Sequence, residues 1–549
     1  MAADQPHPSV SFQTHPSQYA HVALSVEGPV ARVALNVQED RGLRPDDYAL
    51  KLNSYDLGVD IELADAVQRL RFEHPEVTCV VITSAIPGVF CSGANIFMLG
   101  SSAHAFKVNF CKYTNETRLY IEDATAHSGQ TYIAALNGVA SGGGYELPLA
   151  CEEIYLVDDR RSAVALPEVP FLGVLPGTGG LTRVADKRKI RRDRADIFST
   201  LAEGIKGKRA VEWGLVDGVF PTTKFDDKVQ ARAVAIADGG RPDRAGIALT
   251  PIQAQVDDDG NRTYEFVTLT FGPTPRTAIL TMRAPDAVSP LPASPRDLGD
   301  AWWALKAFRE LDDALLHLRF NHLGTGLVLL RTEGDPKTVL ALDEQLLAHQ
   351  DDWYVKEVTL HMKRVLKRLD LTAKTFFALI EEGSAFAGSL LELALAADRQ
   401  YMYDEDGVHV ALSGMNFGLL PMSNDLTRLQ TRFLGDPGHP DALREHIGAC
   451  LAADDAIDHG LVTEAYDDIE WEDEIRLVVE ERASMSPDAL TGMEANLRFA
   501  GPETMETKIF GRLTAWQNWI FQRPNAVGPT GALTLYGRPE SAEFDYDRT

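Results

Sequence analysis

The strongest constraint on the fold is an internal repeat that covers most of the chain. Residues 63–74 (LADAVQRLRFEH) and 311–322 (LDDALLHLRFNH) are identical at seven of twelve positions. A similar spacing, 246 to 248 residues, relates three later pairs of segments: 145–159 with 391–405, 163–171 with 409–417, and 210–216 with 456–462. Similarity at a fixed offset indicates a repeated structural unit. We therefore expect one domain at 1–247, a second copy of it at 248–484, and a C-terminal helical segment at 485–549.

Within each copy, short apolar runs alternate with segments of helical periodicity. In the first copy, residues 21–36 alternate around a Gly-Pro turn, which predicts a hairpin. Residues 60–74 carry Leu63, Val67 and Leu70 at helical spacing. The runs TCVVITS, TYIAALN and EIYLVD are typical of buried parallel strands. This alternation predicts the α/β class.

Charge and cysteine usage exclude several classes of function. The formal net charge of −27 argues against a nucleic-acid partner, because binding to phosphate requires a positive surface. The chain has no apolar run of ~18 residues or more and no signal-peptide pattern, so we expect no membrane span and a cytoplasmic protein. Its five cysteines are scattered, which favours free thiols, and no His/Cys cluster predicts a metal. Basic stretches at 183–194 and 206–209 fit either a local anion site or solvated helix faces.

One segment combines glycines with a carboxylate in a way that suits the binding of an anion. Residues 137–146 (NGVASGGGYE) follow an apolar strand and precede a helical pattern that contains Pro148. Consecutive glycines let a ligand approach the backbone, and N–H groups at a helix N-terminus bind negative charge. Proline is tolerated in a first turn, so we expect this helix to begin close to Pro148. A tight strand-to-helix turn without chemistry would explain the same residues.

A second carboxylate, Glu168, lies among apolar residues and prolines in 165–180 (ALPEVPFLGVLPGTGG). Burial in such surroundings would raise the pKa of Glu168 toward a range useful for proton transfer. A surface or helix-capping role would also suit a single glutamate beside proline. A third segment, 90–95 (FCSGAN), follows the strand CVVITS and offers another backbone N–H.

Taken together and in this order, FCSGAN, NGVASGGGYE and PEVPFLGVLPGTGG resemble the motifs of the crotonase (enoyl-CoA hydratase/isomerase) superfamily. The resemblance implies a duplicated, crotonase-like ββα spiral that acts on a coenzyme-A thioester. It implies that the N–H groups of Ala94 and Gly143 form an oxyanion hole, and that Glu146 and Glu168 transfer protons.

The same resemblance predicts the partners. Coenzyme A, as part of the substrate, would lie near Lys51, Ser92 and Gly142, and no separate cofactor is expected. Proteins of this kind are usually oligomers built through C-terminal helices, so we expect a homodimer.

The second copy departs from the pattern. Its segment 383–392 (GSAFAGSLLE) keeps Glu392 but lacks the triple glycine, and Gly414 stands where Glu168 stands in the first copy. The stretch KTVLALDEQ replaces FCSGAN. We expect a degenerate repeat without an oxyanion hole, retained for structure, a lid or dimer contacts.

The doubled length of the chain reduces the number of reactions that it could catalyse. The second half lacks GxGxxG, which excludes a fused dehydrogenase. Within the superfamily the chain resembles a ring-opening lyase. This implies hydrolytic cleavage of 2,3-epoxy-2,3-dihydrobenzoyl-CoA to 3,4-dehydroadipyl-CoA semialdehyde and formate. The alternatives are an enoyl-CoA hydratase or isomerase for another unsaturated acyl-CoA, and an inactive CoA-binding scaffold.

Several further side chains are candidates for the site. Cys111, on a predicted helix at 104–118, is a possible third catalytic residue, with plain packing as the alternative. Asn115 and Gln130 are weaker polar candidates, and Tyr145 is expected to pack. The sequence leaves open which glutamate is the base and which is the acid.

Overall fold

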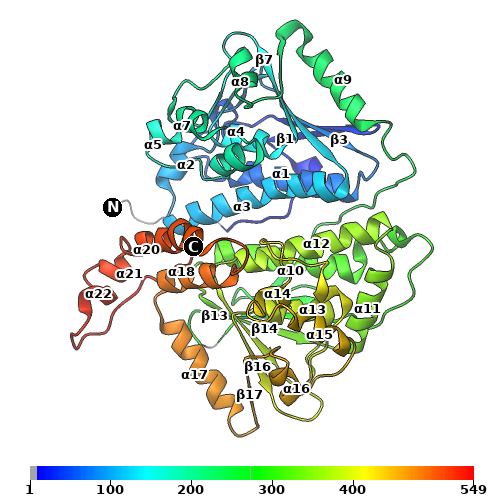
Figure 1. The fold of residues 1–549 in the computed structure, drawn as a ribbon, viewed down its shortest axis with the longest axis vertical. Helices are drawn as coiled ribbons and strands as arrows, with labels where there is room; N and C mark the ends of the chain where they lie inside the picture. Colours follow the sequence, from blue (N-terminus) through cyan, green and yellow to red (C-terminus); the bar gives the residue numbers. More distant parts are fainter. Residues whose placement is uncertain (1–8, 273) are drawn as a thin grey trace. The chain divides into compact units, whose positions relative to one another are not determined.

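The computed structural model describes residues 9–272 and 274–549, and the chain divides into two compact units (Figure 1). The first unit contains Phe12–Pro251, and the second contains Ser9–Ser11 and Ile252–Thr549. The α/β class is confirmed, because strands and helices alternate in both units. None of the helices in the two described ranges is long and apolar enough to cross a membrane.

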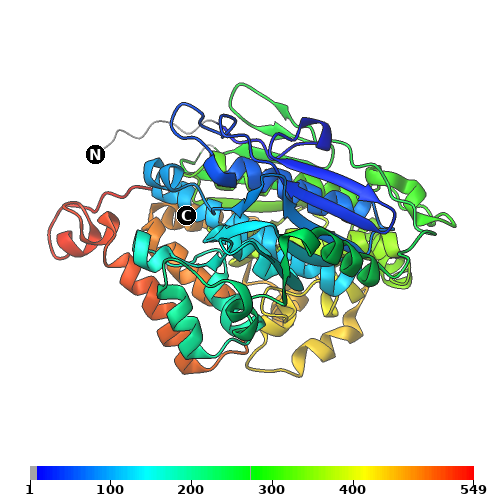
Figure 2. The ribbon, with the colours of Figure 1, turned by 90° about the horizontal axis from the view of Figure 1, so that it is seen from above.

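The first unit is built on a six-stranded sheet in the order β1-β2-β3-β5-β7-β9. Strands β1 and β2 form the expected antiparallel hairpin, dark blue in Figure 2, and all other neighbours are parallel. All six residues of β3 are buried, as its continuous apolar run predicts. The strands are β1 (Val22–Glu27), β2 (Val30–Leu35), β3 (Cys79–Ser84), β5 (Thr131–Leu136), β7 (Glu153–Asp158) and β9 (Gly218–Pro221).

A second sheet of three short parallel strands, β4-β6-β8, is interleaved with the first. The chain passes from β3 into β4 (Gly88–Cys91), from β5 into β6 (Gly138–Ser141), and from β7 into β8 (Val164–Ala165). A helix follows each of these strands, which is the ββα repeat expected for the first copy. Pairing of β4 with β6 sets the two glycine-containing turns that follow them side by side.

Caps and apolar faces position the helices of the first unit. α1 begins after Asp56, whose carboxylate accepts the N–H groups of Gly58 and Val59. α9 packs Phe225 and Val229 against buried residues of the main sheet. The helices are α1 (Leu57–Phe72), α2 (Ile96–Ser101), α3 (His104–Asp123), η3 (Ala124–Ser128), α4 (Gly143–Ala150), α5 (Glu168–Leu172), α6 (Gly180–Thr182), η4 (Arg183–Lys187), α7 (Arg192–Thr200), α8 (Gly207–Glu212) and α9 (Phe225–Ala237), with 3₁₀ turns η1 (Pro16–Gln18), η2 (Lys51–Asn53) and η5 (Thr222–Lys224).

The second unit contains an eight-stranded sheet in sequential order, β10 to β17. Strands β10 to β13 pair antiparallel, and β13 to β17 pair parallel, so β12 to β17 repeat the pattern of the first unit's main sheet. The strands are β10 (Gln255–Val256), β11 (Arg262–Thr263), β12 (Val267–Phe271), β13 (Thr277–Arg283), β14 (Leu327–Glu333), β15 (Thr375–Ile380), β16 (Arg399–Tyr403) and β17 (Glu464–Tyr466).

The repeat is incomplete where the small sheet would lie. In the described part of the second unit, isolated bridges such as Ala387 with Ala411 replace that sheet, and helix α11 replaces the FCSGAN turn. The helices are η6 (Pro295–Ala301), α10 (Trp303–Asn321), α11 (Pro336–Ala348), α12 (Trp353–Leu371), α13 (Gly388–Ala396), η7 (Gly414–Phe417), α14 (Arg428–Arg432), α15 (His439–Ala442), η8 (Leu443–His446), α16 (Ala453–Asp458), α17 (Trp471–Ser484), α18 (Pro487–Arg498), α19 (Met505–Lys508), η9 (Ile509–Leu513), α20 (Thr514–Ile520), α21 (Pro524–Val527) and α22 (Ala532–Leu535).

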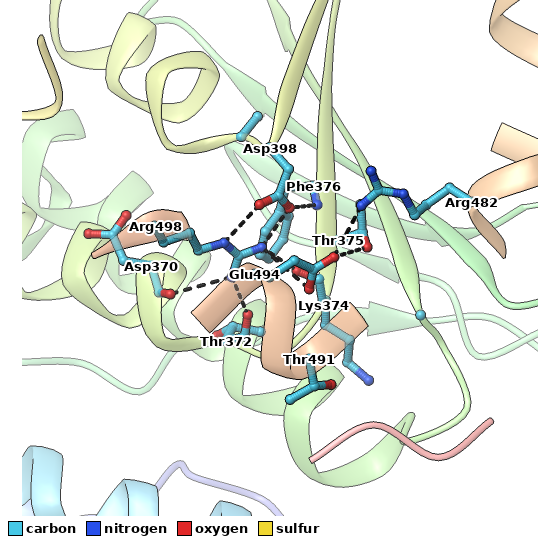
Figure 3. A network of polar contacts seen from close by, with 12 residues as sticks. Asp370, Thr372, Lys374, Thr375, Phe376, Asp398, Arg482, Thr491, Glu494 and Arg498 are labelled. Carbon is cyan, nitrogen blue, oxygen red and sulfur yellow. Dashed lines mark hydrogen bonds and ion pairs between the residues drawn. The ribbon is translucent and has the colours of Figure 1, made fainter. Parts of the chain in front are cut away.

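Helix α18 is anchored at the amino ends of β15 and β16 by a buried ionic network (Figure 3). Arg498 pairs with Asp398 at 2.6 Å, directly before β16. Glu494, one turn earlier on the same helix, pairs with Arg548 at 2.6 Å. The network therefore ties both the last long helix and the end of the chain to the second unit.

Candidate active site

The two glycine-containing turns meet at the ends of β4 and β6. Gly93 has a φ of 94°, and a side chain there would lie 2.9 Å from the carbonyl oxygen of Ser141. The same side chain would lie 3.0 Å from the backbone nitrogen of Gly143. Glycine alone suits both this conformation and so close an approach. The FCSGAN turn is thereby held against the first residue of α4.

Ala94 and Gly143 each present a backbone N–H beside this contact. Tyr55 pairs with one side of the turn: its N–H donates to Gly93 O at 3.0 Å, and it accepts the N–H of Asn95 at 2.8 Å. In such parallel pairing the N–H of the intervening Ala94 points away from Tyr55. The N–H of Gly143 lies in the first turn of α4 and has no acceptor within the helix. In the described chain neither N–H has a protein acceptor, so both are available to a ligand oxygen.

Glu146 lies on α4, one turn after Gly143, and is 2% exposed. Its carboxylate accepts the N–H of Gly180 at 2.7 Å and the hydroxyl of Thr178. Burial raises the pKa of Glu146, while these hydrogen bonds and the nearby Arg118 act in the opposite direction. Both oxygens are thus held by donors that stabilise the ionised form.

The start of α4 differs from the expectation based on Pro148. The helix begins at Gly143, five positions before the proline, so Pro148 lies in the second turn. Proline has no N–H to continue the helical pattern, and α4 ends two residues later at Ala150. The short helix therefore accommodates the proline without losing its N-terminal turn.

Glu168 is the first residue of α5 and is 8% exposed. Its Oε1 would lie 2.8 Å from a side chain at Gly142, which also has a φ of 57°, so glycine is needed at 142. Its Oε2 is buried and has no hydrogen-bond partner among the described residues. Burial, followed by the charge of Glu146, raises the pKa of Glu168 to about 7.

The two glutamates therefore have different environments. Glu146 accepts two hydrogen bonds that favour its ionised form, whereas Glu168 has an unpartnered buried oxygen and a pKa raised to about 7. Two carboxyl groups with separated protonation states can serve as a base and an acid at one pH. This contrast was not visible in the sequence, because it depends on which distant groups reach each side chain.

Two further candidates, Cys111 and Asn115, lie on helix α3. Cys111 is half-buried on α3, and burial, with the charge of Glu146, raises the pKa of its thiol to about 11. Asn115, one turn later, donates to Gly177 O at 3.1 Å, close to the Glu146 donors Thr178 and Gly180.

Two other candidates have structural roles, and two lie at the surface. Gln130 donates to the carbonyl of Leu70 at 2.7 Å within the core, away from the α4 turn. Tyr145 donates to Leu215 O at 2.6 Å, which agrees with its expected packing role. Ser92 and Lys51 are exposed neighbours beside the Ala94 turn, and the Ser92 hydroxyl donates to the Lys51 carbonyl at 3.4 Å.

Sequence reasoning missed four residues that support Glu146 and the α4 turn. Thr178 and Gly180 belong to the third motif, so the motif itself carried a signal for them. Arg118 and Asp60 form a buried pair at 2.7 Å on α3 and α1, and their sequence context carries no comparable signal.

The corresponding place in the second unit is filled by the chain itself. Glu392, the counterpart of Glu146, is fully buried and paired with Arg428 at 2.8 Å. Arg428 also pairs with Asp370 at 2.7 Å. Asp343 of α11 accepts the N–H of Ser389 at 2.7 Å. The carboxylate of Glu392 is paired and the start of α13 is occupied, so the described residues of this unit leave no open counterpart of the α4 site.

The chain is similar to a family model and to a curated relative. Residues 49–276 match the family model described as enoyl-CoA hydratase/isomerase. Over 544 residues the chain is 55% identical to the benzoyl-CoA-dihydrodiol lyase of Aromatoleum evansii, covering 98% of each chain.

Among solved structures, the chain is similar to an enoyl-CoA hydratase of Geobacillus kaustophilus HTA426, with 34% identity, a TM-score of 0.35, and coverage of 40% of this chain and 75% of that one. It is also similar to an enoyl-CoA hydratase of Bacillus anthracis, with 28% identity, a TM-score of 0.33, and coverage of 40% and 76%. The near full-length match confirms the expected fold class. The chain belongs to the crotonase (enoyl-CoA hydratase/isomerase) family.

Proposed function

We propose that this protein is a benzoyl-CoA-dihydrodiol lyase, a carbon–carbon lyase of aromatic degradation. The reaction is hydrolytic, non-oxygenolytic cleavage of 2,3-epoxy-2,3-dihydrobenzoyl-CoA to 3,4-dehydroadipyl-CoA semialdehyde and formate, with consumption of two waters. The observation that carries the proposal is 55% identity to a benzoyl-CoA-dihydrodiol lyase along 98% of both chains. The first unit also supplies two free backbone donors and two buried glutamates beside one helix start.

In the proposed mechanism the thioester oxygen binds the N–H groups of Ala94 and Gly143. These donors stabilise the negative charge that reaches this oxygen when the conjugated ring is attacked. Glu146, whose hydrogen bonds with Thr178 and Gly180 favour the ionised form, accepts a proton from the attacking water. Glu168, which retains its proton to about pH 7, protonates the ring oxygen as its carbon–oxygen bond breaks. A second water completes the carbon–carbon cleavage that releases formate.

The proposed mechanism uses no metal and no cofactor besides the coenzyme A of the substrate. Backbone N–H groups provide the charge stabilisation and the two carboxyl groups provide the proton transfers. Coenzyme A is proposed to extend past Gly142 toward Ser92 and the exposed Lys51. A protonated Cys111 thiol is proposed to line the acyl pocket rather than to act as a base.

The decisive experiment measures formate release from enzymatically prepared 2,3-epoxybenzoyl-CoA. Glu146→Gln and Glu168→Gln each keep the size of the side chain and remove its ionisation, so each is expected to abolish formate release while benzoyl-CoA still binds. Glu152→Gln, at an exposed position two residues after α4, is the matched control and should retain full activity. Hydration of crotonyl-CoA without formate would instead identify a hydratase, and inactivity on both substrates would favour a CoA-binding scaffold.

We also propose a cytoplasmic homodimer. All five cysteines are free, as expected in a reducing compartment. The C-terminal helices expose large apolar side chains, including Phe510 at 73%, Met505 at 73% and Leu497 at 66%. Large apolar side chains exposed on these helices suit a protein–protein contact. Phe510→Asp is expected to shift the mass measured by light scattering from dimer to monomer, whereas Val256→Asp, exposed in β10, should leave it unchanged.

A further inference from the structure

Tyr55 has a buried hydroxyl with no hydrogen-bond partner beside the oxyanion donors. The side chain is 4% exposed, and in the described chain its Oη finds no protein acceptor or donor. A side chain at Gly143 would lie 2.0 Å from this oxygen, so the hydroxyl contacts the first residue of α4. Because Cβ positions in a helix tilt toward its N-terminus, the hydroxyl lies at the end where the free N–H groups are found.

The surroundings of Tyr55 keep its ring in place. Its backbone pairs with Gly93 and Asn95, on the two sides of Ala94. The Arg118 guanidinium lies 5.3 Å from the centre of the ring. A hydroxyl on such a fixed frame is preorganised, since no rearrangement is needed to present it to a ligand.

The chemistry of the group suits a hydrogen-bond donor. Burial raises the pKa of Tyr55 well above its usual value, so the phenol keeps its proton at neutral pH. Buried hydroxyl groups normally have a partner, and an unpartnered one at a site calls for an explanation. Glu168, whose Oε1 approaches Gly142 at the same helix start, has a second unpartnered buried oxygen, Oε2. Two such atoms around one turn suit hydrogen bonds to a ligand that carries oxygen atoms.

We propose that Tyr55 donates a hydrogen bond to the thioester oxygen of the bound acyl-CoA, as a third donor beside the N–H groups of Ala94 and Gly143. This inference rests on the proposed function, because it requires an acyl thioester at the α4 turn. The phenol bond strengthens as the oxygen gains negative charge, so Tyr55 stabilises the transition state more than the bound substrate.

The test uses Tyr55→Phe, which keeps the ring and its contacts and removes only the hydroxyl. The probe is benzoyl-CoA labelled with ¹³C at the thioester carbonyl, and its stretching frequency is recorded by difference infrared spectroscopy in the complex. Wild type is expected to lower this frequency relative to free benzoyl-CoA, and Tyr55→Phe to reverse part of the shift. The kcat for formate release should fall by about 100-fold with little change in KM, in line with loss of one preorganised donor.

Two controls separate function from structure. Tyr145→Phe removes a buried hydroxyl that is bonded to Leu215 O, so it should lower stability and leave the carbonyl frequency and kcat unchanged. Tyr55→Phe removes an unpartnered hydroxyl, so its thermal midpoint should equal or exceed that of wild type. Replacement of Tyr55 by 3-fluorotyrosine, a more acidic phenol of nearly the same shape, should enlarge the infrared shift.

The outcomes distinguish the inference from the function on which it rests. A shift in wild type that persists unchanged in Tyr55→Phe overturns the role of Tyr55 and leaves the oxyanion hole intact. If wild type does not lower the carbonyl frequency, both the oxyanion hole and the role of Tyr55 as a third donor are wrong. Formate release by wild type still tests the overall reaction separately.

Discussion

The carboxylate of Asp343 accepts the backbone N–H of Ser389 at 2.7 Å, deep inside the second unit. Ser389 is the sequence counterpart of Gly143, whose N–H in the first unit has no protein acceptor. Asp343 is completely buried, and its Oδ2 also accepts the hydroxyl of Ser413 at 2.6 Å. The second copy therefore carries an internal carboxylate where the first copy leaves a helix start open. Replacement of the FCSGAN turn by α11 made this contact possible.

Asp343→Asn is expected to change how stability depends on pH. Burial raises the pKa of Asp343 from 3.8 to about 7, so the folded state holds this proton more tightly than the unfolded state. The contribution of Asp343 to stability is therefore full below about pH 4 and is lost as pH rises to about 7. Asp343→Asn should remove this loss, worth roughly 4 kcal/mol at most at ~1.4 kcal/mol per pKa unit. Urea denaturation at pH 5 and pH 8 measures the part of this loss that falls between these two pH values.

Asp335→Asn is the matched control for that experiment. Asp335 is the exposed N-cap of the same helix, and asparagine caps equally well. If the pH dependence of stability is unchanged in Asp343→Asn but altered in Asp335→Asn, it does not arise from Asp343.

Arg428→Met is expected to destabilise the second unit strongly. Arg428 pairs with Asp370 and Glu392, and all three side chains are about 1% exposed. Removing the cation leaves two buried carboxyl groups without their partner, a change that typically lowers stability by about 3–5 kcal/mol. Arg191→Met removes an exposed pair with Asp193 and should leave stability unchanged. Equal urea midpoints for the two variants would refute the importance of the buried pair.

The pH dependence of formate release tests the acid role of Glu168. Its pKa of about 7 requires kcat/KM to fall as pH rises above that value, because the acid loses its proton. Rates measured from pH 5 to pH 9 should show this falling limb in wild type and in Glu152→Gln. Any trace of formate release that is left in Glu168→Gln should lack this falling limb. A rate that increases through pH 7 would show that Glu168 acts as the base instead.

Cys111→Ala is expected to reduce kcat by less than about 10-fold, because a thiol with a pKa near 11 is protonated at neutral pH and is a poor base. Iodoacetamide should correspondingly inactivate wild type slowly at pH 7. Cys450→Ala, at an exposed position, controls for loss of a reactive thiol elsewhere. A loss of 100-fold or more in Cys111→Ala alone would establish a direct chemical role.

Gly144→Ala is expected to disrupt the start of α4. A side chain there would lie 2.1 Å from the carbonyl oxygen of Cys91, and backbone on both sides prevents relief of the clash. Gly100→Ala is the contrasting variant, because nothing lies within 4 Å of the added carbon in α2. It should be neutral or stabilising by about 0.5–1 kcal/mol through lower chain entropy. Thermal melts should show a loss of stability, and formate assays a loss of activity, in Gly144→Ala but not in Gly100→Ala.

The sequence by itself determined the architecture to a large extent. Alternating apolar runs specified α/β units, since the periodicity of burial is a local property of each strand and helix. The constant offset between the copies showed the duplication, and the loss of glycines showed which copy is degenerate. The resemblance of three local motifs to one family predicts Ala94, Gly143, Glu146 and Glu168 as site residues, and the structure brings the elements that carry them together.

Only the tertiary structure decided how these groups differ from one another. Glu146 meets Thr178 and Gly180, more than 30 residues away, while Glu168 keeps an unpartnered oxygen. Tyr55 reaches Gly143 across nearly 90 positions of sequence. Protonation states and free donors depend on desolvation and on partners from distant segments, which a local pattern does not encode.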